Sequence, residues 1–193
     1  VVFTRTLSEG YVGINGLFTD ILNILSLSEL GVGTAITYAL YAPIARRDIK
    51  KQQILMRMFR NFYRITAGFV LLAGLCLIPF LDILMKDRPD VNHLIIIYLL
   101  YLLNSVVSYL LIYKKTLVDA HQMNYITVMY HNGFLVLQDI LQIMVLFLTR
   151  NFILFLVIAV ICTIIGNICM SRRADRLFPY LKEPCKEQLP QEE

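Results

Sequence analysis

Long apolar runs alternate with short polar segments along most of this chain. Two of the runs, residues 94–113 and 152–170, contain no charged side chain, and each is close to the roughly 20 residues that cross a bilayer core as a helix. Three more runs are apolar but carry polar groups. The pattern therefore predicts an all-α membrane protein with five spans, at residues 15–41, 65–85, 94–113, 124–148 and 152–170.

The composition agrees with a polytopic membrane protein. Hydrophobic residues make up 58% of the chain and charged residues only 17%, whereas soluble domains contain about 45–50% and about 25%. The net charge of +4 does not indicate a nucleic-acid partner, because the basic residues lie between apolar runs rather than on a soluble face. We expect a helical bundle over residues 1–178 and a mobile polar tail over 179–193.

The basic residues predict the orientation of the spans. Residues 42–64, the segment 114–122 and the C-terminal tail together hold fourteen Lys and Arg, and the opposite side holds four. Since Lys and Arg accumulate in cytoplasmic loops, the first side is predicted to be cytoplasmic. Residues 50–64 could form an interfacial helix on the anionic leaflet or a cytoplasmic extension of the next span. The chain begins with Val1 and shows no signal peptide, so we expect a preceding helix.

The predicted span 15–41 is the most polar of the five. It carries Asp20, Asn23 and Glu29, and two glycines follow Glu29. A carboxylate in hydrocarbon costs at least about 2.5–3.5 kcal/mol, so such residues usually face a bundle interior or a water-filled cavity. The glycines permit an unwound backbone next to a cavity, or close helix packing alone.

The fourth span, 124–148, carries a polar stripe. At 100° per residue its six polar groups fall within a sector of about 120°. These groups are Asn124, His131, Asn132, Gln138, Asp139 and Gln142. The stripe either lines a path through the membrane or makes interhelical hydrogen bonds that hold the bundle together. For Asp139 we favour a functional role, because an uncharged Asn would serve packing equally well.

The third span, 94–113, also has a polar face, of about 140°. It is formed by Tyr98, Tyr101, Asn104, Ser105, Ser108 and Tyr109. Tyrosine rings can stack on a sugar while their hydroxyls bond to it. Alternatively, the serines form a seam of small residues for helix packing, and the outer tyrosines anchor at the interfaces.

Motifs of known enzymes are absent from the sequence. It contains no Gly-x-Ser-x-Gly, no phosphate-binding glycine loop with Lys and Ser/Thr, and no His-Glu-x-x-His. The four cysteines form no Cys-x-x-Cys pair and have no histidine at ligand spacing. We therefore expect neither an enzyme nor a bound metal or cofactor.

Four segments resemble one family of membrane proteins. They are INGLFTDIL at 14–22, LSLSELGVGTAI at 25–36, YAPIA at 41–45 and RRADRLFPYL at 172–181. The first three are similar to the second helix of the bacterial polysaccharide flippases, and the last to the charged segment after their sixth helix. These flippases are the O-antigen and capsule transporters of the multidrug/oligosaccharidyl-lipid/polysaccharide exporter superfamily.

The resemblance implies a transporter of twelve helices in two six-helix lobes, of which this chain would hold helices two to six. It implies alternating access that moves an undecaprenyl-pyrophosphate-linked glycan to the outer leaflet of the bacterial cell membrane. A glycan polymerase or glycosyltransferases would be possible partners. On this scheme Asn23, Tyr101, Asn104, His131, Gln138 and Gln142 would line the path.

The predicted spans offer no Lys or Arg for an anionic headgroup. Their carboxylates, Asp20, Glu29 and Asp139, instead suit a coupling cation such as H⁺ or Na⁺, since desolvation raises a carboxylate's pKa and favours protonation. Two alternatives therefore stay open. One is a cation-coupled multidrug exporter of the same fold, and the other is a non-transporting scaffold that docks glycan-synthesis enzymes through its basic face.

Overall fold

The computed structural model describes residues 9–26, 32–81 and 93–182. Within these ranges the chain is helical and contains no strand. The α-helices are α2 (Glu9–Ser26), α3 (Val32–Ala45), α4 (Ile49–Leu77), α6 (Leu94–Leu110), α7 (Ile112–Ala120), α8 (Asn124–Thr149) and α9 (Phe152–Leu177). Short 3₁₀ turns, η2 (Ile78–Phe80) and η3 (Pro179–Lys182), follow α4 and α9.

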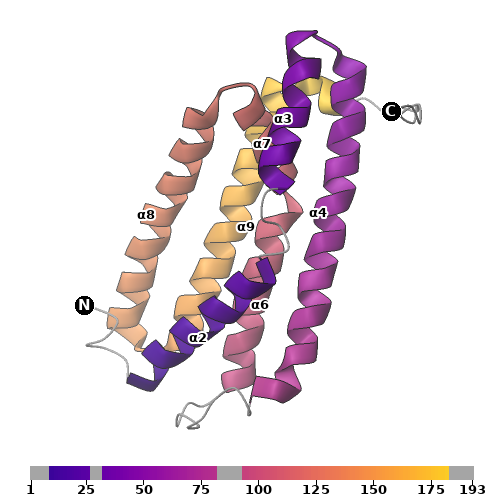
Figure 1. Cartoon of the computed structure of the whole chain (residues 1–193). Helices are drawn as coiled ribbons and strands as arrows, with labels where there is room; N and C mark the ends of the chain where they lie inside the picture. Colours follow the sequence, from indigo (N-terminus) through magenta and orange to yellow (C-terminus); the bar gives the residue numbers. More distant parts are fainter. Residues whose placement is uncertain (1–8, 27–31, 82–92, 183–193) are drawn as a thin grey trace.

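The long helices lie side by side as a bundle (Figure 1). Helices α4, α6, α8 and α9 run along its length, and α2 crosses one half of it obliquely. Helices α3 and α7 lie in the other half, at the end where the α3–α4 and α7–α8 turns are found. We call this the α7 end of the bundle.

Three helices are long and apolar enough to cross a membrane, namely Ile49–Phe80, Asn124–Thr149 and Phe152–Leu177. A fourth candidate span is α6 together with α7, which are bent by 42° at their junction. The described part of the chain is thus a helical bundle with three or four candidate membrane spans. The predicted number of five is not confirmed.

The predicted first span, 15–41, differs most from expectation. Its described parts belong to two separate helices, α2 of 18 residues and α3 of 14 residues, with different directions in Figure 1. At 1.5 Å per residue they measure about 27 Å and about 21 Å, and both are shorter than the hydrocarbon core of about 30 Å. Glu29 lies outside the described residues.

Helix α4 settles the two alternatives for residues 50–64. It runs without a break for 29 residues from Ile49, so this segment extends the span and is not a separate interfacial helix. The carboxylate of Asp48 starts the helix by accepting a 3.0 Å hydrogen bond from the backbone N–H of Lys51, which satisfies a free donor of the first turn. Leu55 and Phe59 of the segment are buried.

The helix predicted over 94–113 ends earlier than expected. It is interrupted at Leu111, whose φ of −122° and ψ of 4° are not helical, and α7 begins at Ile112. The Ser108 hydroxyl donates a 2.6 Å hydrogen bond to the carbonyl of Ser105 just before the bend. Serine bonds of this kind compete with the helical ladder and can bend a helix. The break leaves the first turn of α7 inside the bundle.

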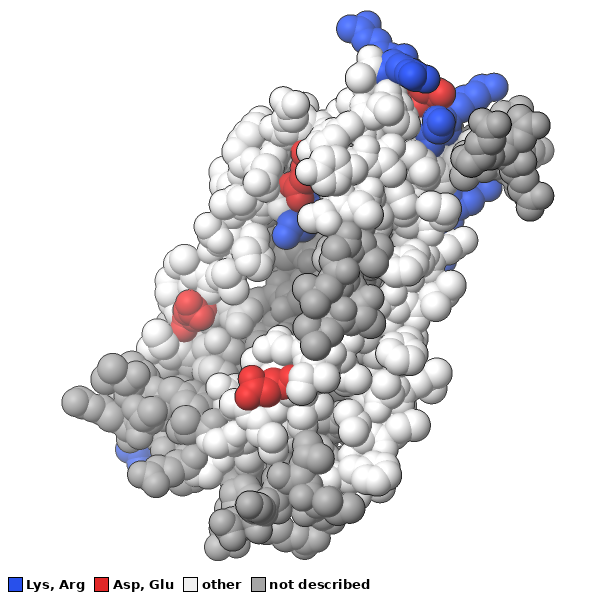
Figure 2. Space-filling model, in the orientation of Figure 1, with Lys and Arg blue, Asp and Glu red and all other residues white. Residues whose placement is uncertain are grey.

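Basic side chains gather at the α7 end (Figure 2). One of them is tied to α9, because Lys114 contacts Asp175 at 2.7 Å and Ser171 at 2.8 Å. The segment after α9 is also fixed there, since the Tyr180 hydroxyl donates a 2.6 Å hydrogen bond to Oε1 of Gln52 on α4. Burial raises the pKa of Tyr180 to about 12, so this hydroxyl stays a proton donor at neutral pH.

Candidate functional site

A cleft of about 330 Å³ lies between α6, α8 and α9 and reaches the start of α7. Its size falls at the lower end of the range for ligand pockets. Each of the four helices contributes polar side chains to its walls. They are Asn104, Ser105, Ser108, Lys115, Thr127, Tyr130, His131, Gln138, Thr163 and Asn167.

Helical periodicity explains this lining. On α8, Thr127, His131, Phe134 and Gln138 face the cleft at spacings of three or four residues, which places them on one side of the helix. On α9, Gly166 lets the ring of Phe134 approach the backbone: a Cβ atom at position 166 would lie 3.1 Å from Cγ of Phe134. The two helices are therefore in close contact beside the cleft.

Two polar atoms in the cleft wall are buried without a hydrogen-bond partner, Oδ1 of Asn104 and Oγ1 of Thr127. Thr127 is only 3% exposed. Elsewhere in the bundle a threonine is satisfied by its own helix, as where Thr116 donates to the carbonyl of Ile112 at 3.2 Å. Leaving such a group unpaired costs about 1–3 kcal/mol. A ligand that bonds to these atoms would recover part of that cost.

The charge of the cleft is positive. Lys115 is in the wall, no carboxylate is, and Lys115 forms no ion pair with any described residue. Its neighbour Lys114 is neutralised by Asp175. The sequence interpretation placed both lysines in a cytoplasmic segment and found no cation in the spans. No sequence spacing could have identified Lys115, because the bend at Leu111 interrupts the helical periodicity between α6 and α7.

Three of the residues predicted to line a path do line this cleft, namely Asn104, His131 and Gln138. His131 is exposed on the surface of α8, whereas Asn104 and Gln138 are partly buried. The cleft therefore joins polar groups from α6 and α8 that are more than twenty residues apart in sequence.

Two other predicted residues make contacts between helices. Gln142 is 6% exposed and its amide donates a 3.0 Å hydrogen bond to the carbonyl of Phe155 on α9. Tyr101 donates to Oδ1 of Asn15 and so ties α6 to α2. Neither residue lines the cleft. For these two the packing interpretation accounts for the observed contacts.

The acidic residues are not gathered at the cleft. Asp20 on α2 and Asp139 on α8 are exposed and neither lines it, and the same holds for Asn23. Figure 2 shows acidic side chains as separate patches rather than one cluster. The physical reason at Asp139 is rotational: Gln138 and Gln142 face α9, and the 100° step from Gln138 turns Asp139 outward. The cleft therefore collects only part of the predicted polar stripe.

Metal ligation finds no support in the described residues, where no three His, Cys, Asp or Glu side chains are grouped to hold an ion. Comparison of the chain with models of known families, with curated proteins and with solved structures found no match.

Proposed function

We propose that this chain forms part of a flippase that moves a lipid-linked oligosaccharide to the outer leaflet of a bacterial cell membrane by alternating access. The observation that carries the proposal is the cleft itself. It has hydrogen-bonding walls, one lysine and no carboxylate, and it lies inside a bundle of helices that are long and apolar enough for a membrane. The segments that resemble polysaccharide flippases also support this proposal.

The lining suits a sugar that carries an anion. Sugar hydroxyls can donate to the unpaired Oδ1 of Asn104 and exchange hydrogen bonds with the amide of Gln138. The ring of Tyr130 offers a flat apolar surface beside them. No covalent chemistry is needed, since translocation requires only that the path be polar where the glycan passes.

The cleft is too small to hold a whole oligosaccharide, so the proposed path continues over the exposed polar residues nearby. Asp20, His131 and Asp139 are exposed on helices of this apolar bundle. Acyl chains are an unfavourable environment for them, so in our proposal they face a second lobe across a water-filled path. Asp20, Glu29 and Asp139 remain our candidates for coupling to H⁺ or Na⁺. The α7 end, with its basic residues, would be cytoplasmic.

The proposal is tested by complementation in a bacterium from which the gene has been deleted. Asn104→Leu and Gln138→Leu remove hydrogen-bonding groups from the cleft wall, and we expect each to lower surface polysaccharide at an unchanged level of protein. Asp139→Leu should abolish it if that carboxylate couples the ion. The matched control is Asn61→Leu, because Asn61 is an exposed amide on α4 that does not line the cleft.

Equal polysaccharide from all these variants would contradict the proposal. Loss of polysaccharide in the Asn61 variant alone would place the path along α4 instead. Protein levels in the membrane fraction separate either result from poor expression.

A cation-coupled drug exporter is the second candidate, favoured by the exposed carboxylates Asp20 and Asp139. A cationic drug is a poor match for a cleft whose charged wall residue is Lys115. Drug accumulation in the deletion strain distinguishes the two functions. If the protein is an exporter, cationic drugs should accumulate more and surface polysaccharide should stay normal. If it is a flippase, drug accumulation should stay unchanged and surface polysaccharide should be lost.

A further inference from the structure

The α7 end of the cleft combines two features that favour an anion. Helix α7 begins within the bundle, and Leu111, Ile112 and Lys115 from its start line the cleft. The first N–H groups of a helix lack partners within it, and here they lie at the bend between α6 and α7. The ammonium group of Lys115 is one turn further along the same helix.

An independent observation comes from α8 on the other side of the cleft. Thr127 is 3% exposed, lines the cleft, and has no hydrogen-bond partner for its hydroxyl. A hydroxyl can donate to a phosphate oxygen, as can an ammonium group and a helix N-terminus. The unpaired hydroxyl is therefore evidence that a ligand occupies this end of the cleft.

The surrounding charges leave Lys115 available for such a ligand. Lys114 is paired with Asp175 and lies outside the cleft wall. Asp119 is one turn beyond Lys115 on α7, but it does not line the cleft either. His131 is the other ionisable wall residue that could carry positive charge.

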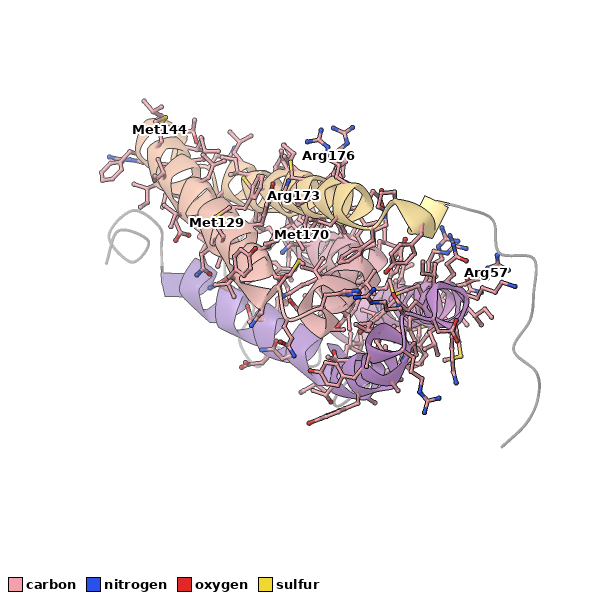
Figure 3. The ribbon with its side chains drawn as sticks, turned by 90° about the horizontal axis from the view of Figure 1, so that it is seen from above. Arg57, Met129, Met144, Met170, Arg173 and Arg176 are labelled. Carbon is pink, nitrogen blue, oxygen red and sulfur yellow. The ribbon has the colours of Figure 1, made fainter. Side chains whose placement is uncertain are left out.

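The rest of the wall mixes polar and apolar side chains. Phe134 and Leu135 of α8 and Met170 of α9 line it, and Figure 3 shows Met170 on the inner side of α9, with Arg176 on the outer side. Most of the surface of the cleft is apolar, so it suits an amphiphile whose anionic group lies near Lys115. The volume of about 330 Å³ fits a headgroup with part of a chain and excludes an oligosaccharide.

We propose that the cleft binds one anionic glycerophospholipid, with its phosphate between Lys115, the first turn of α7 and Thr127, and with an acyl chain along Phe134 and Met170. The α7 end is where basic side chains gather (Figures 1 and 2), and basic pockets between helices on the cytoplasmic side recognise such headgroups. This site lies in the same cleft as the proposed start of the glycan path, but its evidence, Lys115 and the unpaired hydroxyl of Thr127, does not depend on the flippase proposal.

The test uses the purified 193-residue chain in a neutral detergent and counts bound lipid by native mass spectrometry. The probes are phosphatidylglycerol, phosphatidylcholine with the same acyl chains, and inorganic phosphate. We expect one phosphatidylglycerol to bind about tenfold more tightly than phosphatidylcholine, because a charge-assisted contact is worth about one decade or more in affinity. Lys115→Gln should remove this preference, and Thr127→Val should weaken it several-fold.

Arg176→Gln is the matched control. It also removes one positive charge at the α7 end, but from the outer side of α9 (Figure 3), so it should leave the preference unchanged. Lys115→Arg keeps the charge and should retain the preference, which separates a lost contact from a folding defect. Equal losses in Lys115→Gln and Arg176→Gln would reduce the effect to general surface attraction and overturn the proposal. Competition by inorganic phosphate at the affinity of phosphatidylglycerol would overturn the assignment to a lipid.

Because this assay measures binding and not transport, its failure leaves the flippase proposal standing. Conversely, normal surface polysaccharide in cells that lack the gene would reject the flippase proposal and leave the lipid site intact.

Discussion

Helix α6 presents two contrasting faces to its neighbours. Towards α4 it is close-packed and its polar groups are satisfied: the Tyr98 hydroxyl donates a 2.8 Å hydrogen bond to the carbonyl of Gly74, and Leu102 is 1% exposed. Towards α8 and α9 the same helix borders a cleft, in which Asn104 has an acceptor atom without a partner.

The comparison separates two uses of polar residues in a membrane bundle. A polar side chain with a partner on the next helix, such as Tyr98, stabilises the assembly, whereas one that is buried without a partner destabilises it. A destabilising group in a cleft is a candidate for ligand contact. Substitutions on the two faces of α6 should therefore have opposite consequences.

The largest effect is expected at the close contact between α4 and α6. A Cβ atom at Gly74 would lie 2.3 Å from Cδ1 of Leu102, so Gly74→Val must displace the buried side chain of Leu102. Overpacking of this kind costs about 1–3 kcal/mol, and we expect a clearly lower midpoint of thermal unfolding in detergent. Gly133→Val on α8 is the control, because nothing lies within 4 Å of a Cβ atom there. Equal destabilisation by both variants would mean that the contact with Leu102 is not the cause.

A smaller loss is expected from Tyr98→Phe. This change keeps the ring, which contacts Phe18 at 5.1 Å between centroids, and removes only the hydrogen bond to Gly74. The free energy of unfolding should fall by about 1 kcal/mol. If a denaturant titration shows no change in the free energy of unfolding, the hydrogen bond from Tyr98 does not stabilise the packing of α6 against α4.

Gln142→Leu tests a satisfied polar contact between α8 and α9. The bond from Gln142 to Phe155 is satisfied, so its loss should cost about 0.6 kcal/mol, typical of polar contacts between membrane helices. The same variant should leave the preference for phosphatidylglycerol unchanged, since Gln142 does not line the cleft. A stabilised Gln142→Leu chain would contradict the structural role assigned to it.

The smallest effect is expected from Asn104→Leu. Because the Asn104 acceptor is already unpaired, an apolar replacement should change the unfolding free energy by about 0.5 kcal/mol or less, or should stabilise the chain. Its consequence should appear instead as reduced surface polysaccharide in the complementation assay. A loss of stability similar to that of Tyr98→Phe would mean that both faces of α6 serve packing alone.

The sequence predicted the helical membrane class and the positions of α8 and α9, because a run of about twenty mostly apolar residues has one stable conformation in a bilayer. It was less successful at 15–41, where continuous apolar character did not distinguish one span from the two helices α2 and α3. The bend at Leu111 was also missed, since the sequence there contains neither Pro nor Gly; the Ser108–Ser105 hydrogen bond that precedes the bend is visible only in the structure.

Periodicity predicted which residues share a helical face, such as His131 and Gln138 on α8, and both of these line the cleft together with Asn104 of α6. Tertiary structure alone decided which way each face turns. It directs Gln142 to α9 and Asp139 to the surface, and it brings Lys115 to the cleft across a bent junction. The reason is that lipid and protein interior are both apolar, so the hydrophobic pattern of a membrane helix does not fix its rotation. Contacts with neighbouring helices do.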